Sequence, residues 1–233
     1  MKGSQLALPV QLTQAPTFET FFAGPNADIV DALRVIAGRR SPVPAAWIYG
    51  AGASGKTHLL RATVAAAGKG AAYSAAAIAC DALGALQDEP LLALDDVEDA
   101  LTDEARGLVL LRLIDRRRER GLPLLLAGNV APARLADISS DLRSRLEAMA
   151  LLGIKPLRED DRRELVRLQA QQRGLELADD VVSWLIARLR RDAGTLIAAL
   201  EEIDNATLSA KRRPTLPFVQ QTIGPLLQLP LLH

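Results

Sequence analysis

The sequence predicts an α/β fold in which a parallel sheet is flanked by helices and is followed by a small all-helical region. Three observations lead to this prediction. Up to residue 157, short apolar runs alternate with longer helical patterns, as they do when helices join parallel strands. A glycine-rich loop separates the first apolar run from the helical pattern that follows it. After residue 157 only helical patterns continue.

The individual elements follow from the period of the apolar residues. Strands are expected at residues 45–49, 70–74, 90–94 and 122–127, with a last apolar run at 150–157. Helices are expected at residues 55–67, around 80–86, and at 102–120 and 139–147. In the second region they are expected at residues 160–173, 178–190 and 192–212, with a fourth after Pro217. The acidic residues 159–161 favour a helix start because carboxylates stabilise the positive end of the helix dipole.

Composition limits the classes of protein to which the chain can belong. Apolar residues make up 49% of the 233 residues, which is typical of a globular protein. The 28 acidic and 28 basic residues cancel, so a strongly basic DNA-binding surface is not expected. The single cysteine, Cys80, cannot form an internal disulfide, and no run approaches the roughly 18 apolar residues of a membrane helix. These features predict a cytoplasmic protein without membrane contact.

The glycine-rich loop carries the strongest chemical signal. Gly50-Ala51-Gly52-Ala53-Ser54-Gly55-Lys56-Thr57 fits the pattern G-x-x-x-x-G-K-[ST] without deviation, between a strand and a helix. Backbone N–H groups of Gly50, Gly52, Ser54 and Gly55 are expected to converge on a phosphate at the helix N-terminus. Lys56 can reach the β- and γ-phosphates, and the Thr57 hydroxyl can bind Mg²⁺. His58 borders this site, although packing is its simplest role.

Two further strand ends supply polar groups. Leu91-Leu92-Ala93-Leu94-Asp95-Asp96 is typical of a Walker B strand, in which Asp95 binds the metal and Asp96 polarises the attacking water. Such a run on its own is as often an ordinary strand end, but its position after the glycine-rich loop favours the functional interpretation. Asn129 ends the next strand, where its amide can contact a γ-phosphate or serve only as a turn former.

Arginines on two predicted helices have competing interpretations. Arg145, in Ser144-Arg145-Leu146, can act in trans as an arginine finger, but the residues alone favour a solvated arginine. The run Arg116-Arg117-Arg118 with Arg120 can contact DNA, but a solvated helix face is the favoured interpretation.

Taken together, these motifs resemble the initiator clade of AAA+ proteins. The resemblance covers residues 17–225 and includes Phe22-Ala23-Gly24-Pro25-Asn26, part of an opening segment that lies near the adenine in that clade. It implies that Asn26 contacts the nucleotide and that the chain has an AAA+ nucleotide-binding domain at residues 16–157 and a helical lid domain at 158–233. The initiator DnaA continues into a DNA-binding domain that is not expected here.

The N-terminus resembles one family within the clade. Gln5-Leu6-Ala7-Leu8-Pro9, in an extended segment at residues 1–15, is similar to the clamp-binding peptide of the Hda family, the regulatory inactivators of DnaA. Leu6 and Leu8 would enter an apolar pocket and Gln5 would form an oriented hydrogen bond, and Pro9 belongs to the same clamp-binding peptide. A second glutamine-leucine segment, at residues 228–232, ranks below the first because the resemblance does not support it.

The Hda resemblance implies negative regulation of DNA replication initiation. The DNA polymerase III β sliding clamp would recruit the chain, so that DNA is contacted only indirectly. Arg145 would then stimulate hydrolysis of ATP bound to DnaA, giving inactive DnaA-ADP, while the chain itself binds ADP or ATP with Mg²⁺. The alternatives are a clamp-tethered AAA+ ATPase, such as a helicase loader acting on another partner, and a nucleotide-gated binding module. A homodimer remains open.

One position departs from the clade. In Asp192-Ala193-Gly194-Thr195-Leu196, glycine stands where the clade usually has a sensor arginine. Arg191 lies three residues back, about one helical turn away, and is the candidate substitute for a cation near the γ-phosphate.

Overall fold

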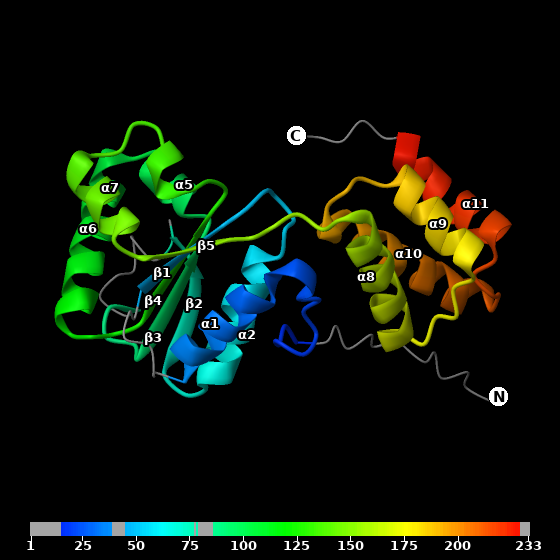
Figure 1. Cartoon of the computed structure of the whole chain (residues 1–233), viewed down its shortest axis with the longest axis horizontal. Helices are drawn as coiled ribbons and strands as arrows, with labels where there is room; N and C mark the ends of the chain where they lie inside the picture. The colour runs from blue at the N-terminus through cyan, green and yellow to red at the C-terminus, as the bar shows by residue number, and fades with distance from the viewer. Residues whose placement is uncertain (1–14, 39–44, 77, 79–85, 229–233) are drawn as a thin grey trace, which may run out of the picture.

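The computed structural model describes residues 15–38, 45–76, 78 and 86–228, and shows a sheet-containing part beside an all-helical part (Figure 1). The sheet consists of five parallel strands in the order β2-β3-β4-β1-β5. The strands are β1 (Ala45–Tyr49), β2 (Ala71–Ala75), β3 (Leu91–Asp95), β4 (Leu124–Gly128) and β5 (Ala150–Gly153). Every residue of β3 and β4 is buried, as expected for parallel strands covered on both faces.

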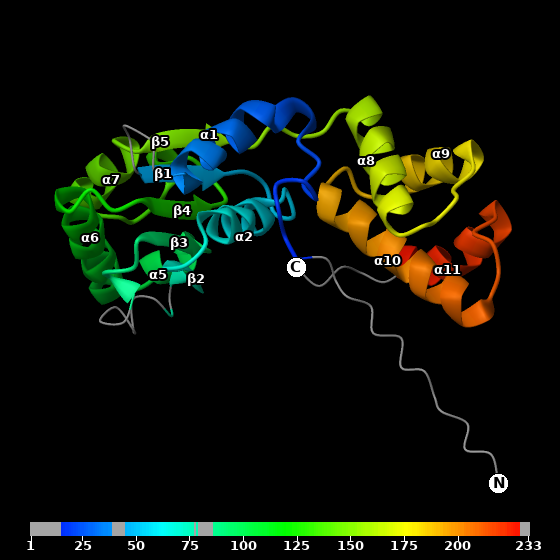
Figure 2. The ribbon, with the colours of Figure 1, turned by 90° about the horizontal axis from the view of Figure 1, so that it is seen from below.

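Helices cover both faces of the sheet, as Figure 2 shows from below. On one face lie α1 (Ala27–Ala37) and α2 (Lys56–Ala67), and on the other lie α5 (Val97–Leu101), α6 (Glu104–Glu119) and α7 (Ser140–Glu147). Side chains along each strand point to alternate faces. Trp47 therefore packs under α5 to α7, whereas its neighbours Ala46 and Ile48 pack under α1 and α2.

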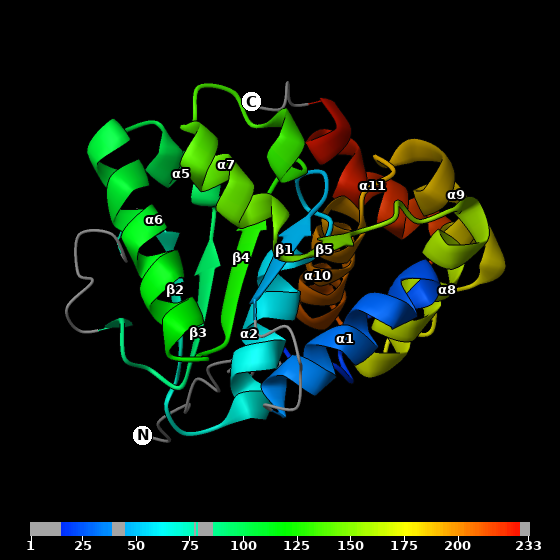
Figure 3. The ribbon, with the colours of Figure 1, turned by 60° about the vertical axis from the view of Figure 1, so that its left-hand side comes forward.

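The all-helical part, called the lid below, comprises α8 (Glu159–Gln172), α9 (Asp179–Arg188), α10 (Ala193–Ala210) and α11 (Leu216–Gln228). Its apolar residues form a third core, separate from the two cores of the sheet. Figure 3 shows the four helices grouped beside α1 and α2. Phe22, from the segment before α1, also packs on the lid core, while its neighbour Phe21 packs on a sheet core. The opening segment therefore bridges the two parts.

Most of the expected elements are present, with boundaries that differ by a few residues. The expected run at 150–157 forms a strand only as far as Gly153, because the chain then leaves the sheet to reach α8. Helices α1 and α5 were not expected from the sequence. The helix expected around residues 80–86 lies almost entirely outside the described residues. None of the helices in the described part of the chain is long and apolar enough to cross a membrane.

The arginine run on α6 is not a uniformly solvated face. Arg117 is fully buried and donates hydrogen bonds to the carbonyl oxygens of Gln87, Glu89 and Pro123. Burial, reinforced by the charge of Arg120, lowers the pKa of Arg117 to about 10. Arg116 and Arg120 are exposed and both pair with Asp88. The interpretation as a solvated side chain is therefore wrong for Arg117, whose hydrogen bonds join α6 to the loops that precede β3 and β4.

Candidate functional site

The loop between β1 and α2 has the backbone conformation that the glycine-rich motif requires. Gly55, immediately before α2, has φ 99°, a conformation that L side chains rarely adopt. A Cβ atom at this position would also lie 2.8 Å from Cε2 of Phe21. The loop therefore turns sharply into the N-terminus of α2, where backbone N–H groups and the helix dipole favour an anion.

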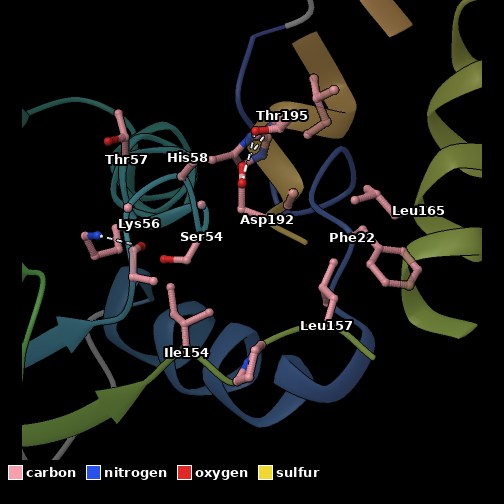
Figure 4. A pocket seen from close by; sticks show the side chains of 18 of the residues that line it. Phe22, Ser54, Lys56, Thr57, His58, Ile154, Leu157, Leu165, Asp192 and Thr195 are labelled. Carbon is pink, nitrogen blue, oxygen red and sulfur yellow. Dashed lines mark hydrogen bonds between the residues drawn. The ribbon is translucent and has the colours of Figure 1, made fainter. Parts of the chain in front are cut away.

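A cavity of about 910 Å³ opens between this loop, the opening segment and the lid. Figure 4 shows its two different ends. Ser54, Lys56 and Thr57 lie at one end, and Phe22, Leu157 and Leu165 lie at the other. Ile154, after the end of β5, lies beside Ser54. A polar end beside a helix N-terminus and an apolar end are the surroundings that phosphates and a planar base require.

Lys56 is held at the polar end by its own chain. Its Nζ donates hydrogen bonds to the carbonyl oxygens of Gly50 (2.9 Å) and Ala51 (3.2 Å) and to Oδ1 of Asn129 (3.0 Å). Burial lowers the pKa of Lys56, and the negative charges of Asp95, Glu98 and Asp96 oppose this effect. The structure thus brings the expected lysine and the expected asparagine into direct contact.

The end of β3 places Asp95 against α2. Oδ2 of Asp95 accepts hydrogen bonds from the Thr57 hydroxyl (2.6 Å) and from the Tyr73 hydroxyl (2.9 Å). The backbone N–H of Asp96 donates to Oδ1 of Asp95 (3.1 Å). Two oxygen groups expected to bind Mg²⁺, Thr57 and Asp95, are therefore adjacent, and a magnesium ion would obtain its remaining ligands from phosphates and water. The described residues contain no group of three or more His, Cys, Asp and Glu that could hold a metal ion by themselves.

Asp96 has a strained backbone and faces the cavity. Its φ and ψ are both 51°, in the left-handed region that non-glycine residues seldom occupy. Partial burial and the negative charge of Asp95 raise the pKa of Asp96. This carboxylate is therefore a better proton acceptor than an ordinary surface aspartate, which suits a group expected to polarise water.

Two residues at this edge were not expected from the sequence. Glu98, in the short helix α5, accepts a hydrogen bond through Oε1 from the backbone N–H of Asn129, and its buried Oε2 has no hydrogen-bond partner in the described structure. Tyr73 on β2 binds Asp95, and the Arg61 guanidinium lies 4.7 Å from the Tyr73 ring centroid. Glu98 follows Asp96 by only two residues, so its closeness to the expected site could have been inferred from the sequence. No sequence pattern points to Tyr73 as a site residue.

The opening segment is fixed to the cavity wall by two of the expected residues. The Asn26 side chain is buried, donating to the carbonyl oxygen of Lys155 (3.1 Å) and accepting from its N–H (2.7 Å). Nε2 of His58 lies 2.8 Å from the carbonyl oxygen of Thr17 and 3.3 Å from Oγ1 of Thr20. Both residues line the cavity, so they shape its wall through contacts within the chain.

The lid touches the glycine-rich loop directly. The N–H of Gly194, in the first turn of α10, donates to the carbonyl oxygen of Ala53 (3.2 Å). A Cβ atom at Gly194 would lie only 2.7 Å from Cβ of Ala53. In this arrangement the position has no room for a side chain. Arg191 lines the same cavity and is exposed, whereas Arg190 pairs with Asp192.

Arg145 is absent from the residues that line the cavity. It lies on α7, on the sheet face opposite α1 and α2, with its Nε donating to Oδ1 of Asp115 on α6 (2.6 Å). The Arg145 side chain remains 39% exposed. Arg143, two residues earlier, instead donates to the carbonyl oxygens of Pro132 and Leu135 and fixes the 3₁₀ turn η2 (Pro132–Arg134).

The expected clamp-binding residues Gln5, Leu6, Leu8 and Pro9 lie outside the described residues. Most of the second glutamine-leucine segment, at residues 228–232, lies outside them as well.

One family model and several known proteins match the chain. The model of the Hda lid domain matches residues 159–223. An uncharacterized protein of Haemophilus influenzae is 31% identical over 234 residues, covering 95% of this chain and 99% of its own. Domain III of the Thermotoga maritima initiator DnaA superposes with a TM-score of 0.82 at 18% identity, covering 93% of this chain and all of that structure.

Two further solved structures share the fold. AMPPCP-bound DnaA from Aquifex aeolicus has a TM-score of 0.70 at 22% identity, covering 83% of this chain and 65% of that one. The Thermotoga maritima RuvB branch-migration motor has a TM-score of 0.67 at 17% identity, covering 86% and 68%. The expected AAA+ fold, with its parallel sheet and helical lid, is thereby confirmed. The chain belongs to the Hda-like, DnaA-related AAA+ proteins of the initiator clade.

Proposed function

We propose that this chain is a negative regulator of replication initiation that binds a nucleotide in its own cavity and activates hydrolysis of ATP bound to DnaA. The product would be inactive DnaA-ADP. Family membership supports DnaA as the partner. The proposals that the chain binds a nucleotide and that it activates ATP hydrolysis rest on the geometry of its cavity and on the position of Arg145 on α7.

The chain's own cavity suits ADP or ATP. The N–H groups of the loop at residues 50–55 would bind the β-phosphate, and Lys56 would exchange its carbonyl partners for phosphate oxygens. Thr57 and Asp95 would hold Mg²⁺, which neutralises phosphate charge when bound. The base would lie at the apolar end, beside Phe22 and Leu157. Asn26 and His58 would act by fixing the segment that forms this wall.

The observation that carries the proposal is the position of Arg145. The Arg145 side chain is 39% exposed on α7 and does not line the chain's own cavity, so any phosphate that it binds would belong to another molecule. An arginine finger supplied in trans stabilises the charge of the phosphoryl-transfer transition state and accelerates hydrolysis by about 10³- to 10⁵-fold in known systems. Catalysis would therefore occur on the nucleotide of DnaA.

Recruitment by the sliding clamp is a separate part of the proposal. The sequence Gln5-Leu6-Ala7-Leu8-Pro9 supports it because two leucines with a glutamine amide beside them suit a shallow pocket on a partner when such a peptide binds in an extended form. DNA would be contacted only through the clamp.

The experiment measures hydrolysis of radiolabelled ATP bound to DnaA in the presence of DNA-loaded clamp. The full chain is compared with a variant lacking residues 1–9. We expect fast hydrolysis that needs both the clamp and the N-terminal peptide. Clamp binding without any stimulation would reject the regulatory role.

A second candidate, an autonomous clamp-tethered ATPase or helicase-loader-like protein, is favoured by one observation. The groups expected to bind phosphate and Mg²⁺ and to polarise water lie together: Lys56, Thr57 and Asp96 line the chain's own cavity, and Asp95 accepts a hydrogen bond from Thr57. Steady-state ATP turnover by the chain alone, abolished in Asp96→Asn, would support this candidate, and turnover at background would reject it.

A further inference from the structure

The Arg145 guanidinium is held by one residue of a neighbouring helix. Oδ1 of Asp115, on α6, accepts a hydrogen bond from Nε of Arg145 at 2.6 Å. The two side chains are 38% and 39% exposed, so the pair lies at the surface and not in a core. Surface ion pairs of this kind contribute little to folding stability.

The choice of nitrogen is informative. A guanidinium presents Nε, Nη1 and Nη2 as a rigid planar fork, and carboxylates or phosphates are bound best by two of these groups together. Because Asp115 is bound through Nε, the hydrogen bond leaves Nη1 and Nη2 for a second anion. Asp115 also limits the rotamers that this long side chain can adopt, which removes part of the entropy cost of later binding.

Arg143 provides an internal contrast on the same helix. Its Nη1 and Nη2 donate to the carbonyl oxygens of Pro132 and Leu135, so its terminal nitrogens are already used within the chain. Of the two arginines in this turn of α7, Arg145 is therefore the one whose outer nitrogens make no hydrogen bond within the described residues while its inner nitrogen is fixed.

We propose that Asp115 is a positioning residue for Arg145, holding the guanidinium through Nε so that Nη1 and Nη2 bind phosphate oxygens of a nucleoside triphosphate carried by a partner. This inference rests on the proposed function. The pair need not break when the phosphate arrives, because the carboxylate and the phosphate use different nitrogens. The opposite arrangement, in which Asp115 masks Arg145 and must be displaced, predicts a faster reaction without Asp115.

The test measures single-turnover hydrolysis of ATP bound to DnaA, with DNA-loaded clamp, as a function of the concentration of this chain. The variants are Asp115→Ala, Asp115→Asn, Arg145→Ala and the double variant. The control is Glu119→Ala, which removes an exposed acid from the same helix. Thermal melts confirm that each variant is folded.

We expect Asp115→Ala to lower the maximal rate roughly tenfold, because misplaced catalytic groups lose rate even when binding is intact. The concentration giving half-maximal rate should change less than about twofold, since a surface ion pair contributes little. Asp115→Asn keeps an acceptor for Nε and should recover part of the rate. The double variant should be no slower than Arg145→Ala, because Asp115 acts through Arg145.

An unchanged or raised maximal rate in Asp115→Ala would overturn the inference, provided that Arg145→Ala is inactive. If Arg145→Ala also leaves the stimulation intact, the proposed function itself fails. The two failures are therefore distinguishable in one set of measurements.

Discussion

The carboxyl edge of the sheet and the outer face of α7 use charged side chains in opposite ways. At the sheet edge, Lys56, Asp95 and Asn129 are bound to groups of the same chain, and Lys56 and Asn129 line a cavity. On α7, Arg145 is anchored at one nitrogen, its side chain is 39% exposed, and it does not line the cavity described above. The contrast indicates one region that binds the chain's own nucleotide and one that acts on another molecule.

The largest expected effect is the loss of DnaA-bound ATP hydrolysis on removal of Arg145, which should leave the chain's own nucleotide site unaffected. Arg145→Ala should lower the rate at which DnaA hydrolyses its bound ATP by about 10³-fold, the lower range for an arginine finger in trans. The chain's own affinity for ADP, measured by isothermal titration calorimetry, should not change. Arg118→Ala, which removes an exposed arginine of α6, is the matched control. A large loss of ADP affinity in Arg145→Ala would show that Arg145 also serves the chain's own nucleotide site, so that the two regions do not have separate roles.

Lys56→Ala should affect the other region. Loss of a charge-assisted contact to phosphate is expected to weaken ADP and ATP binding about 10- to 100-fold, because hydrogen bonds to charged groups contribute about 1.5–3 kcal/mol. Lys69→Ala, an exposed lysine just after α2, serves as the control. Equal affinities for the two variants in a fluorescent-nucleotide titration would show that this cavity is not the binding site.

The contact between the lid and the glycine-rich loop should be sensitive to a single methyl group. Gly194→Ala places a Cβ 2.7 Å from Cβ of Ala53 and should cost about 1–3 kcal/mol of unfolding free energy, as overpacking does. Gly224→Ala is matched to it, because nothing lies within 4 Å of the added Cβ. That control should gain up to about 1 kcal/mol from helix propensity. Similar melting temperatures for the two variants would show that the lid does not press on the loop.

The smallest expected effect concerns Asp96. Because its folded-state pKa is raised, the folded protein binds this proton more tightly than the unfolded chain, and stability from this group is lost as pH rises through the folded value. At neutral pH the charged carboxylate is therefore slightly unfavourable. Asp96→Asn should raise the melting temperature slightly at pH 7 but not below about pH 3, under the ordinary value for aspartate. A gain of the same size at both pH values would remove the electrostatic explanation.

Sequence patterns predicted most of the parts of this molecule that depend on local order, although they missed helix α1, whose buried residues recur at a helical period. The strand-loop-helix motif and the apolar periods of β3, β4 and the lid helices are properties of consecutive residues, so their elements were found. Helix α5 was not predicted because its five residues are too few to show a helical period.

Contacts between distant segments were not predictable in this way. Tyr73 meets Asp95 only because β2 pairs with β3, and Gly194 meets Ala53 only because the lid folds back over the loop. The buried Arg117 shows the same limit, since its carbonyl partners come from loops before β3 and β4.

The most direct test of the central claim asks which molecule's nucleotide is hydrolysed. Labelled ATP is bound either to DnaA or to this chain, with ADP on the other protein, and single-turnover hydrolysis is followed on DNA-loaded clamp. We expect rapid hydrolysis of the label on DnaA, lost in Arg145→Ala, and no comparable hydrolysis of the label on this chain. Hydrolysis of the chain's own label alone, at a rate unaffected by Arg145→Ala, would contradict that claim.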